Sequence, residues 1–130
     1  MNASTTAADT PSTSTTKTST YRLDTEMYVR SRRLTRAKRV AEMVEREIRA
    51  LLSDHGLRTS HVEPDFERHS GKPFRTHFHL RTTCLIDCTE DEIDEITLEL
   101  QNVLEESEPL ARLVPVDEIE AFWEIYTPRI

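Results

Sequence analysis

The segment THFHLRTTCLIDCTEDEIDEITLELQNVLE, residues 76–105, decides the fold class, because the spacing of its apolar residues changes along its length. As far as Cys84, apolar and polar residues alternate, which is typical of a strand with one buried face. After Thr89 the apolar residues recur every three or four positions, as on one face of a helix: Ile93, Ile96, Leu100, Val103 and Leu104. Thr89 and Glu92 have the spacing of a capping box, so we expect a helix that begins at Thr89 and ends near Ser107.

A second helical pattern precedes this segment. Over residues 24–54 the apolar side chains fall on one helical face, and Gly56 favours the end of the helix; they are Ala37, Val40, Val44, Ile48, Leu51 and Leu52. Between the two helical patterns, alternating runs flank HSGKP at residues 69–73, which predicts a hairpin. Matching the apolar faces pairs Phe66 with Phe74 and Val62 with Phe78.

The two ends of the chain complete the predicted layout. LARLVPVDEIEAFWEIYTPRI predicts strands at 110–115 and 121–127, with 110–116 as a loop in the alternative interpretation. Residues 1–22 are mostly Ser and Thr and are expected to be a disordered tail, which leaves 23–130 as a single domain. The prediction is an α+β two-layer sandwich of order α-β-β-α-β-β, in which two helices cover one face of a small antiparallel or mixed sheet.

The composition is acidic, with 24 acidic against 17 basic side chains and a formal charge of -7. Fourteen of the basic residues are arginines, and many threonines accompany the carboxylates. This resembles proteins of haloarchaea, and the resemblance implies a cytoplasm of molar salt, where charges are screened within roughly 3 Å. Signal-peptide and membrane-span patterns are missing, so we expect a protein of the cytoplasm or of a virion, without a membrane partner.

The charge is divided unevenly along the chain. Residues 21–60 carry ten basic and six acidic side chains, whereas residues 61–130 carry six and seventeen. Within RSRRLTRAKR, the predicted helix places Arg32, Arg36 and Arg39 on one stripe with Arg33 nearby. Three interpretations stay open: a contact with nucleic-acid phosphates, a contact with an acidic protein surface, or a solvated helix end. Because salt weakens phosphate binding steeply, we favour the protein contact.

The histidines of the hairpin raise the question of a metal site. The predicted register sets Glu63 opposite His77 and His61 opposite His79, a group that could ligate a divalent ion. Cys84 points to the other face of its strand and cannot join them. Opposite-charge pairing explains the same pattern without an ion, so metal binding is the weaker interpretation and we expect no cofactor.

The two cysteines have structural explanations. Cys84 is expected to be a small buried apolar residue, and Cys88 to pack against Ile93 at the start of the helix. Because an extended chain holds them roughly 13 Å apart, we expect free thiols.

The end of the chain offers an interface. AFWEIYT at 121–127 places Phe122 and Tyr126 on one face of a strand and Trp123 and Ile125 on the other. Both faces are apolar, so one can pack on the helices while the other is available for association.

These observations favour a structural or assembly protein that forms a homo-oligomer through its terminal strand and its basic helix. No phosphate-binding glycine loop, GxSxG elbow or HExxH pair is present in the sequence, and we expect neither an enzyme nor a small-molecule substrate. The predicted element order is similar to that of tail terminator-like ring subunits at the neck or tail end of tailed viruses. This resemblance implies a virion component of a haloarchaeal virus, in its neck or tail, with a role in tail completion. The alternatives are a nucleic-acid-binding accessory protein and a metal-binding hairpin protein.

Overall fold

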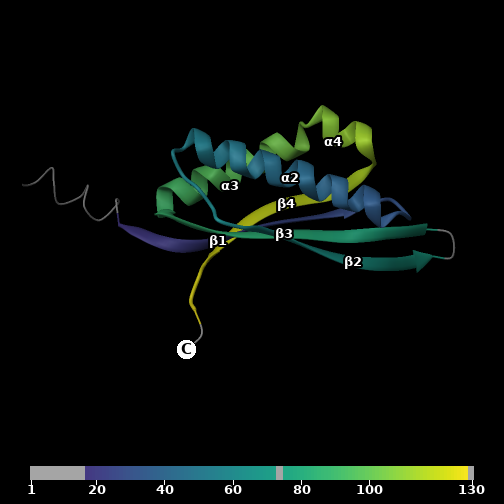
Figure 1. The fold of residues 1–130 in the computed structure, drawn as a ribbon, viewed down its shortest axis with the longest axis horizontal. Coiled ribbons are helices and arrows are strands. Elements are labelled where there is room, and N and C mark those ends of the chain that lie inside the picture. Colours follow the sequence, from purple (N-terminus) through teal and green to yellow (C-terminus); the bar gives the residue numbers. More distant parts are fainter. Residues whose placement is uncertain (1–16, 73–74, 129–130) are drawn as a thin grey trace, which may run out of the picture.

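The computed structural model describes residues 17–72 and 75–128. Within these ranges the chain forms four strands and three helices, in the order β1 (Thr18–Val29), α2 (Leu34–Asp54), β2 (Val62–Lys72), β3 (Arg75–Thr89), α3 (Glu90–Glu105), α4 (Glu108–Leu113) and β4 (Val116–Ile125). The strands form one antiparallel sheet in the order β2-β3-β1-β4. The helices lie together on one side of it (Figure 1). The α+β class and its two layers are therefore as predicted. The observed topology is that of a ferredoxin-like β-α-β-β-α-β unit with one short added helix.

The order of the elements differs from the prediction at the start of the chain. The predicted helix over 24–54 is two elements, because β1 runs to Val29 and α2 begins only at Leu34. Thr18–Arg22, which we assigned to the disordered tail, form the first part of β1; residues 1–16 of that tail lie outside the described residues. β1 is one of the two central strands and lies between β3 and β4, so the sheet depends on a segment whose strand pattern was not recognised.

The order also differs near the other end. The predicted strand over 110–115 is wrong, since Glu108–Leu113 form the short helix α4. The Ser107 hydroxyl oxygen accepts a hydrogen bond from the Leu110 backbone N–H at 3.2 Å, and Pro109 lies in the first turn. Both are features of a helix N-terminus. β4 therefore starts at Val116 and is the single closing strand in the described part of the chain.

The predicted hairpin register is wrong by six residues. Phe66 lies opposite Leu80 and Val62 opposite Cys84, where we expected Phe74 and Phe78. Because side chains alternate with a period of two, an even shift leaves each residue on its predicted face and changes only its partner. Consequently the helix-facing side of the hairpin is apolar as expected, but the cross-strand neighbours on the outer face are different.

The core lies between the sheet and the helices. The predicted apolar stripe of α2 is buried, as are Ile93, Ile96, Leu100 and Leu104 of α3. Each valine, leucine or isoleucine among them contributes about 1.5–3 kcal/mol when fully buried. The predicted capping box is confirmed: the Glu92 N–H donates to Thr89 Oγ1 at 3.1 Å, and the Thr89 N–H donates to Glu92 Oε1 at 2.9 Å. At the end of α2, Gly56 takes a positive φ of 71°, as its predicted role requires.

No helix among the described residues has both the length and the apolar character that crossing a bilayer requires.

Candidate functional site

The outer edge of β4 is the first candidate for an interaction site. In an antiparallel sheet, alternate residues bond to the neighbouring strand and the others direct their N–H and C=O groups outward. The Tyr126 N–H donates to the Thr20 carbonyl at 2.9 Å, so the even-numbered residues in this part of β4 bond to β1. The backbone groups of Ala121, Trp123 and Ile125 therefore point to the outer edge.

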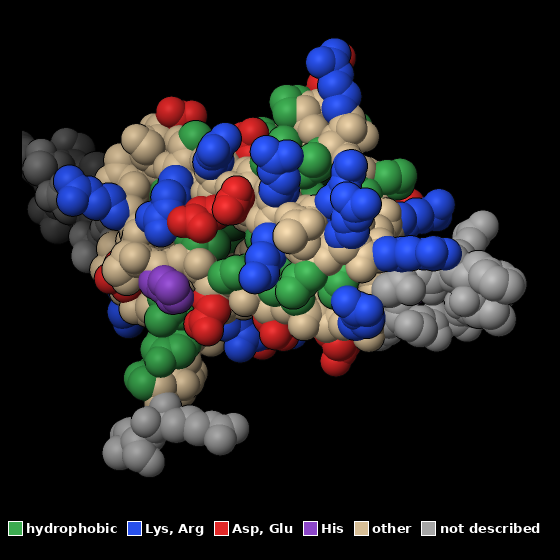
Figure 2. All heavy atoms as spheres, turned by 45° about the vertical axis from the view of Figure 1, so that its right-hand side comes forward, with side chains coloured by type: hydrophobic (Ala, Val, Ile, Leu, Met, Phe, Trp, Pro, Cys, Tyr) green, Lys and Arg blue, Asp and Glu red, His purple; other side chains and the backbone are tan. Residues whose placement is uncertain are grey.

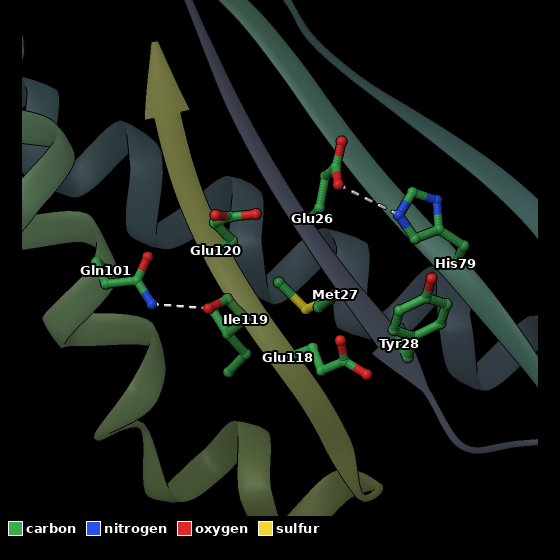
Figure 3. Close-up of a pocket in the computed structure, with 8 residues that line it drawn as sticks. All are labelled: Glu26, Met27, Tyr28, His79, Gln101, Glu118, Ile119 and Glu120. Atoms are coloured by element: carbon green, nitrogen blue, oxygen red, sulfur yellow. Dashed lines mark hydrogen bonds and ion pairs between the residues drawn. The ribbon is translucent and has the colours of Figure 1, made fainter.

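Gln101 of α3 covers the beginning of that edge. Its side-chain Nε2 donates to the Ile119 carbonyl at 2.7 Å (Figure 3). Its Oε1 accepts from the Ala121 N–H, also at 2.7 Å. The amide thus replaces a neighbouring strand where β4 is irregular: the register with β1 shifts near Glu26, and Glu118 has a positive φ of 53°. The outer edge from Trp123 onward lies beyond this covered part.

The predicted interface residues divide between the two faces of β4. Trp123 is on the helix side, where its ring Nε1 donates to Asp94 Oδ1 at 2.8 Å and the ring meets Tyr21 edge to face at 5.1 Å. Trp123 therefore serves the contact between β4 and α3. Ile125 is 61% exposed and Tyr126 is 40% exposed, while Phe122 lies half-buried on the outer face of the sheet.

The opposite edge of the sheet is protected. β2 contains Pro64, which has no N–H to offer to another strand, and it carries Glu63, Asp65 and Glu67 on the outer face. Proline and charged residues are the usual features that prevent edge-to-edge pairing. The two edges of the sheet are therefore unequal, and β4 is the one suited to pairing.

A charged network occupies the outer face of the sheet. Asp24 is fully buried although no helix of the described residues covers this face. Its carboxylate accepts from the Thr83 hydroxyl at 2.7 Å, from Arg22 Nε at 2.9 Å and from Arg81 at 3.3 Å. Arg81 also lies 5.7 Å from the centre of the Phe122 ring. These contacts place a hydrogen-bonded, charged group at the centre of the outer face.

A shallow acidic pocket lies where β1 and β4 separate at the bulge. It has a volume of about 560 Å³ and is lined by Glu26, Met27, Tyr28, His79, Gln101, Glu118, Ile119 and Glu120 (Figure 3). His79 Nε2 lies 3.6 Å from Glu26 Oε1, and the His79 ring is 5.1 Å from that of Tyr28. The pocket is open and mostly polar, and its histidine is engaged by its neighbours.

The predicted arginine cluster is basic and exposed, but it is not one helical stripe. Arg32 and Arg33 precede α2, while Arg36 and Arg39 belong to its first turns. One Arg36 guanidinium nitrogen donates to the Leu113 carbonyl at 2.8 Å. Figure 2 shows many Lys and Arg side chains on the face that carries the helices and at the adjacent end of the molecule. From Arg30 to Ala41 the sequence has six basic residues and no acidic one.

The predicted histidine group of the hairpin is not assembled. The observed register places Glu63 opposite Thr83 and His77 opposite His69, which removes the predicted Glu63–His77 and His61–His79 pairs. His61 Nε2 lies 4.0 Å from Glu63 Oε1, with both side chains more than 70% exposed. The predicted histidine–glutamate and histidine–histidine pairs are lost because the observed hairpin register differs from the predicted one by six residues.

The described residues contain one group of three side chains suited to a metal ion, and sequence reasoning missed it. It consists of His55, Glu95 and Glu99, whose ligand atoms lie within 4.8 Å of one another. The spacing of the two glutamates, four residues apart on a predicted helix, was a signal. Nothing local in the sequence connected them with His55, which follows a different helix.

The cysteines are buried on the helix side of the sheet. Burial and the nearby negative charge of Asp24 raise the pKa of Cys84 to about 12. Burial and the carboxylates of Glu92 and Asp87 raise the pKa of Cys88 to about 11. Both are free thiols, and at neutral pH they stay protonated and weakly nucleophilic.

Comparisons with known proteins do not identify a family. No family model and no curated protein matches the chain. A de novo designed protein, Foldit4, is 17% identical over 83% of this chain and 99% of that chain, with a TM-score of 0.39. A hydantoinase/carbamoylase family amidase from Burkholderia ambifaria is 14% identical, with a TM-score of 0.48; the alignment covers 84% of this chain and 29% of the amidase. Neither similarity assigns a function.

Proposed function

We propose that the protein is a non-enzymatic assembly subunit that self-associates through the outer edge of β4. The observation that carries this proposal is the combination, on one edge, of outward-facing backbone groups and two exposed apolar side chains, Ile125 and Tyr126. Backbone groups on an exposed strand edge are a template for another strand, and adjacent apolar residues add burial to the pairing.

Charge restricts how two copies would pair. A two-fold axis at Glu124 would set two glutamates directly opposite each other, which is destabilising. An axis at Ile125 instead sets Ile125 against its counterpart and Glu124 against Tyr126, and it leaves the edge covered by Gln101 undisturbed. We therefore propose a symmetric antiparallel pairing centred on Ile125, of the isologous type that is common in homodimers.

The basic end of α2 is a second contact in this proposal. An acidic surface of a neighbouring copy, such as that of α3, would complement it. In molar salt the attraction between exposed charges is short-ranged, so we assign most of the affinity to the β4 edge. The setting in a haloarchaeal cell or virus is part of this proposal. The composition supports the haloarchaeal host, whereas the tailed-virus resemblance rested on a predicted element order that differs from the observed one, which begins with β1.

The test is the oligomeric state of the full chain in roughly molar sodium chloride, measured by size-exclusion chromatography with light scattering. We expect a defined oligomer for the wild type and dissociation of the β4 contact in Ile125→Lys. Leu85→Lys is the control, because Leu85 is also an exposed apolar residue, at 39%, but lies on β3, which β1 separates from β4.

A monomeric wild type at concentrations of tens of micromolar would overturn the proposal. An oligomer that survives in Ile125→Lys would remove β4 as its interface. Dissociation of the Leu85→Lys variant alone would move the contact to the outer face of the sheet.

One observation favours nucleic-acid binding as a second candidate. Basic residues gather at the N-terminal end of α2, where the helix dipole already places partial positive charge, and the first turn has no acidic residue. This arrangement is unfavourable within the isolated chain and becomes favourable when an anion such as a phosphate is bound.

Duplex DNA and RNA binding at the working salt concentration tests this candidate. We expect the combined variant of Arg32, Arg33, Arg36 and Arg39 to glutamine to lose binding and to reduce its salt dependence. Arg112→Gln is the control, since Arg112 is an exposed arginine paired with Glu108 on α4. Equal binding by both variants would exclude the cluster as the phosphate contact.

A further inference from the structure

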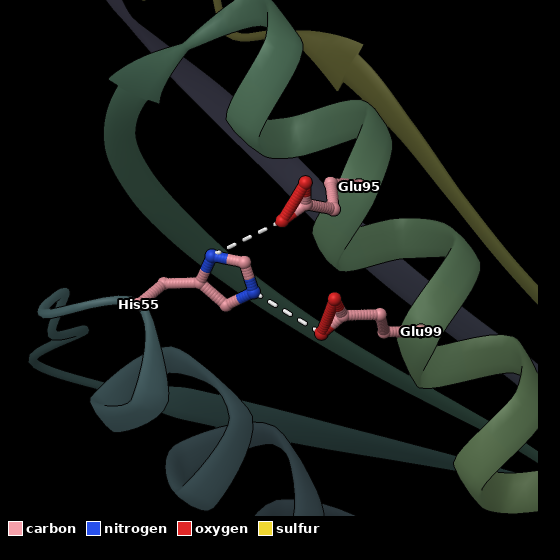
Figure 4. A group of neighbouring side chains, drawn as sticks. All are labelled: His55, Glu95 and Glu99. Carbon is pink, nitrogen blue, oxygen red and sulfur yellow. Dashed lines mark hydrogen bonds and ion pairs between the residues drawn. The ribbon is translucent and has the colours of Figure 1, made fainter.

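We infer that His55, Glu95 and Glu99 form a binding site for a divalent transition-metal ion of the zinc type (Figure 4). The site joins the C-terminal end of α2 to the exposed side of α3. His55 Nε2 lies 3.1 Å from Glu99 Oε1, and His55 Nδ1 lies 3.8 Å from Glu95 Oε1. The inference is independent of the β4 edge, because none of these residues belongs to that strand.

The backbone holds His55 in place. Its N–H donates to the carbonyls of Leu51 and Leu52 at the end of α2, and Gly56 turns the chain away immediately afterwards. The imidazole is 15% exposed, so it is largely enclosed between the two helices. A ligand fixed in this way loses little conformational freedom when it binds an ion, which favours affinity.

The glutamates complete a suitable set of donors. Glu95 and Glu99 are one helical turn apart on α3, and both side chains extend toward the imidazole (Figure 4). One imidazole nitrogen with two carboxylate oxygens suits zinc and similar first-row ions, at bond lengths of about 2.0–2.2 Å. In the tetrahedral geometry of zinc, ligands at that length lie about 3.4 Å apart, so the ligand atoms, now within 4.8 Å of one another, would close around the ion by rotation of the exposed glutamates. Water would occupy the remaining coordination positions.

The charge around the site favours a cation. Glu95 and Glu99 repel each other at the i, i+4 spacing, and α3 contains seven acidic residues with no lysine or arginine. Among the described residues, the ion pairs of these two glutamates are with His55 alone. An ion at this position would offset the repulsion and link two elements that otherwise meet through apolar contacts.

The competing explanation is a simple ion pair between a protonated His55 and the two carboxylates. It uses the same three residues but binds no metal, so metal binding itself distinguishes the two. The hairpin pair His61 and Glu63 provides a matched control, because it offers an imidazole and a carboxylate at 4.0 Å without a second glutamate.

The experiment uses the full chain, freed of metal with a chelator and dialysed into roughly molar potassium chloride. Zinc chloride is titrated by calorimetry, and cobalt chloride is followed by its visible absorption bands. We expect one ion per chain for the wild type and for His61→Ala. We expect His55→Ala and the double variant Glu95→Gln/Glu99→Gln to bind at least about tenfold more weakly.

A wild type that binds neither ion overturns the inference, as does unchanged binding by the double variant. The two glutamates are 63% and 42% exposed, so their replacement by glutamine should leave the fold intact, which far-ultraviolet circular dichroism checks. If His55→Ala fails to fold, the double variant decides the question. The oligomeric state of the same samples is measured with and without zinc, so that a failure of zinc binding can be distinguished from a failure of the β4 proposal.

Discussion

The Thr83 hydroxyl donates a hydrogen bond of 2.7 Å to Asp24, whose carboxylate is fully buried at the centre of the sheet face opposite the helices. Arg22 and Arg81 cover the same carboxylate. We expect Asp24→Asn to lower the free energy of unfolding by about 1–3 kcal/mol, because both guanidinium groups lose their shared partner while remaining only partly solvated. Urea denaturation measures the change.

The control for this network is Asp65→Asn. Asp65 lies on the same sheet face, opposite Arg81, but it is exposed on the edge strand β2. Its loss should change stability by no more than about 0.5 kcal/mol. Equal effects of the two substitutions would show that burial of Asp24 has no energetic consequence.

Gln101 holds the irregular part of β4 through two backbone hydrogen bonds, one from its amide nitrogen and one to its amide oxygen. We expect Gln101→Ala to destabilise the protein by about 1–2 kcal/mol, and the Ala121 amide to exchange its hydrogen faster. Hydrogen-exchange mass spectrometry of the β4 segment measures the exchange. Gln101→Glu keeps the acceptor for Ala121, so protection there should persist, and unchanged exchange in Gln101→Ala would contradict this role.

The helices could be predicted from the sequence because their signals are local. The stripe from Ala37 to Leu52 and the capping box at Thr89 both depend on residues within a few positions of each other. α4 had such a signal too, in Ser107 followed by Pro109, but the apolar residues after them were interpreted as a strand. Signals from neighbouring residues were therefore sufficient to predict α2 and α3, and they would have been sufficient for α4 if the capping signal had been preferred over the strand pattern.

Strand β1 was harder to predict because its pattern includes a buried threonine. Tyr21, Leu23, Thr25, Met27 and Val29 alternate as in a strand with one buried face. The hydroxyl of Thr25 pairs with that of Thr82 inside the core, which makes a polar residue acceptable at a buried position. That compensation depends on a residue far along the chain, and no local pattern reveals it.

The candidate sites were harder to predict than the helices and strands, because most of them combine residues that are far apart in the sequence. The outer face of the hairpin was assigned correctly, but its partners were not, because two registers six residues apart match apolar positions almost equally well. The sequence does not connect His55 with Glu95 and Glu99, because they lie about forty residues further along the chain. The exposed Ile125 and Tyr126 were identified because a strand with two apolar faces is visible in the sequence alone.

The capping box of α3 gives a prediction with a close control. Thr89→Ala removes the acceptor for the Glu92 N–H and should cost about 1 kcal/mol of stability. Thr89→Ser retains the hydroxyl and should stay within about 0.5 kcal/mol of the wild type. Thermal unfolding monitored by circular dichroism compares the three proteins. A Thr89→Ser variant as unstable as Thr89→Ala would assign the effect to the lost methyl group.

The buried thiol of Cys84 predicts a loss of stability at high pH. Burial, with the charge of Asp24, raises the pKa of Cys84 from 9.0 to about 12 in the folded state. Above about pH 9 the unfolded thiol therefore releases a proton that the folded thiol retains, and the free energy of unfolding falls as the pH rises toward 12. The stabilisation is complete below pH 9. We expect Cys84→Val, which keeps a small apolar side chain, to show a weaker decline between pH 8 and pH 10.5 in urea denaturation than the wild type. Since other titrating groups are common to both proteins, identical slopes would mean that Cys84 ionises normally in the folded state.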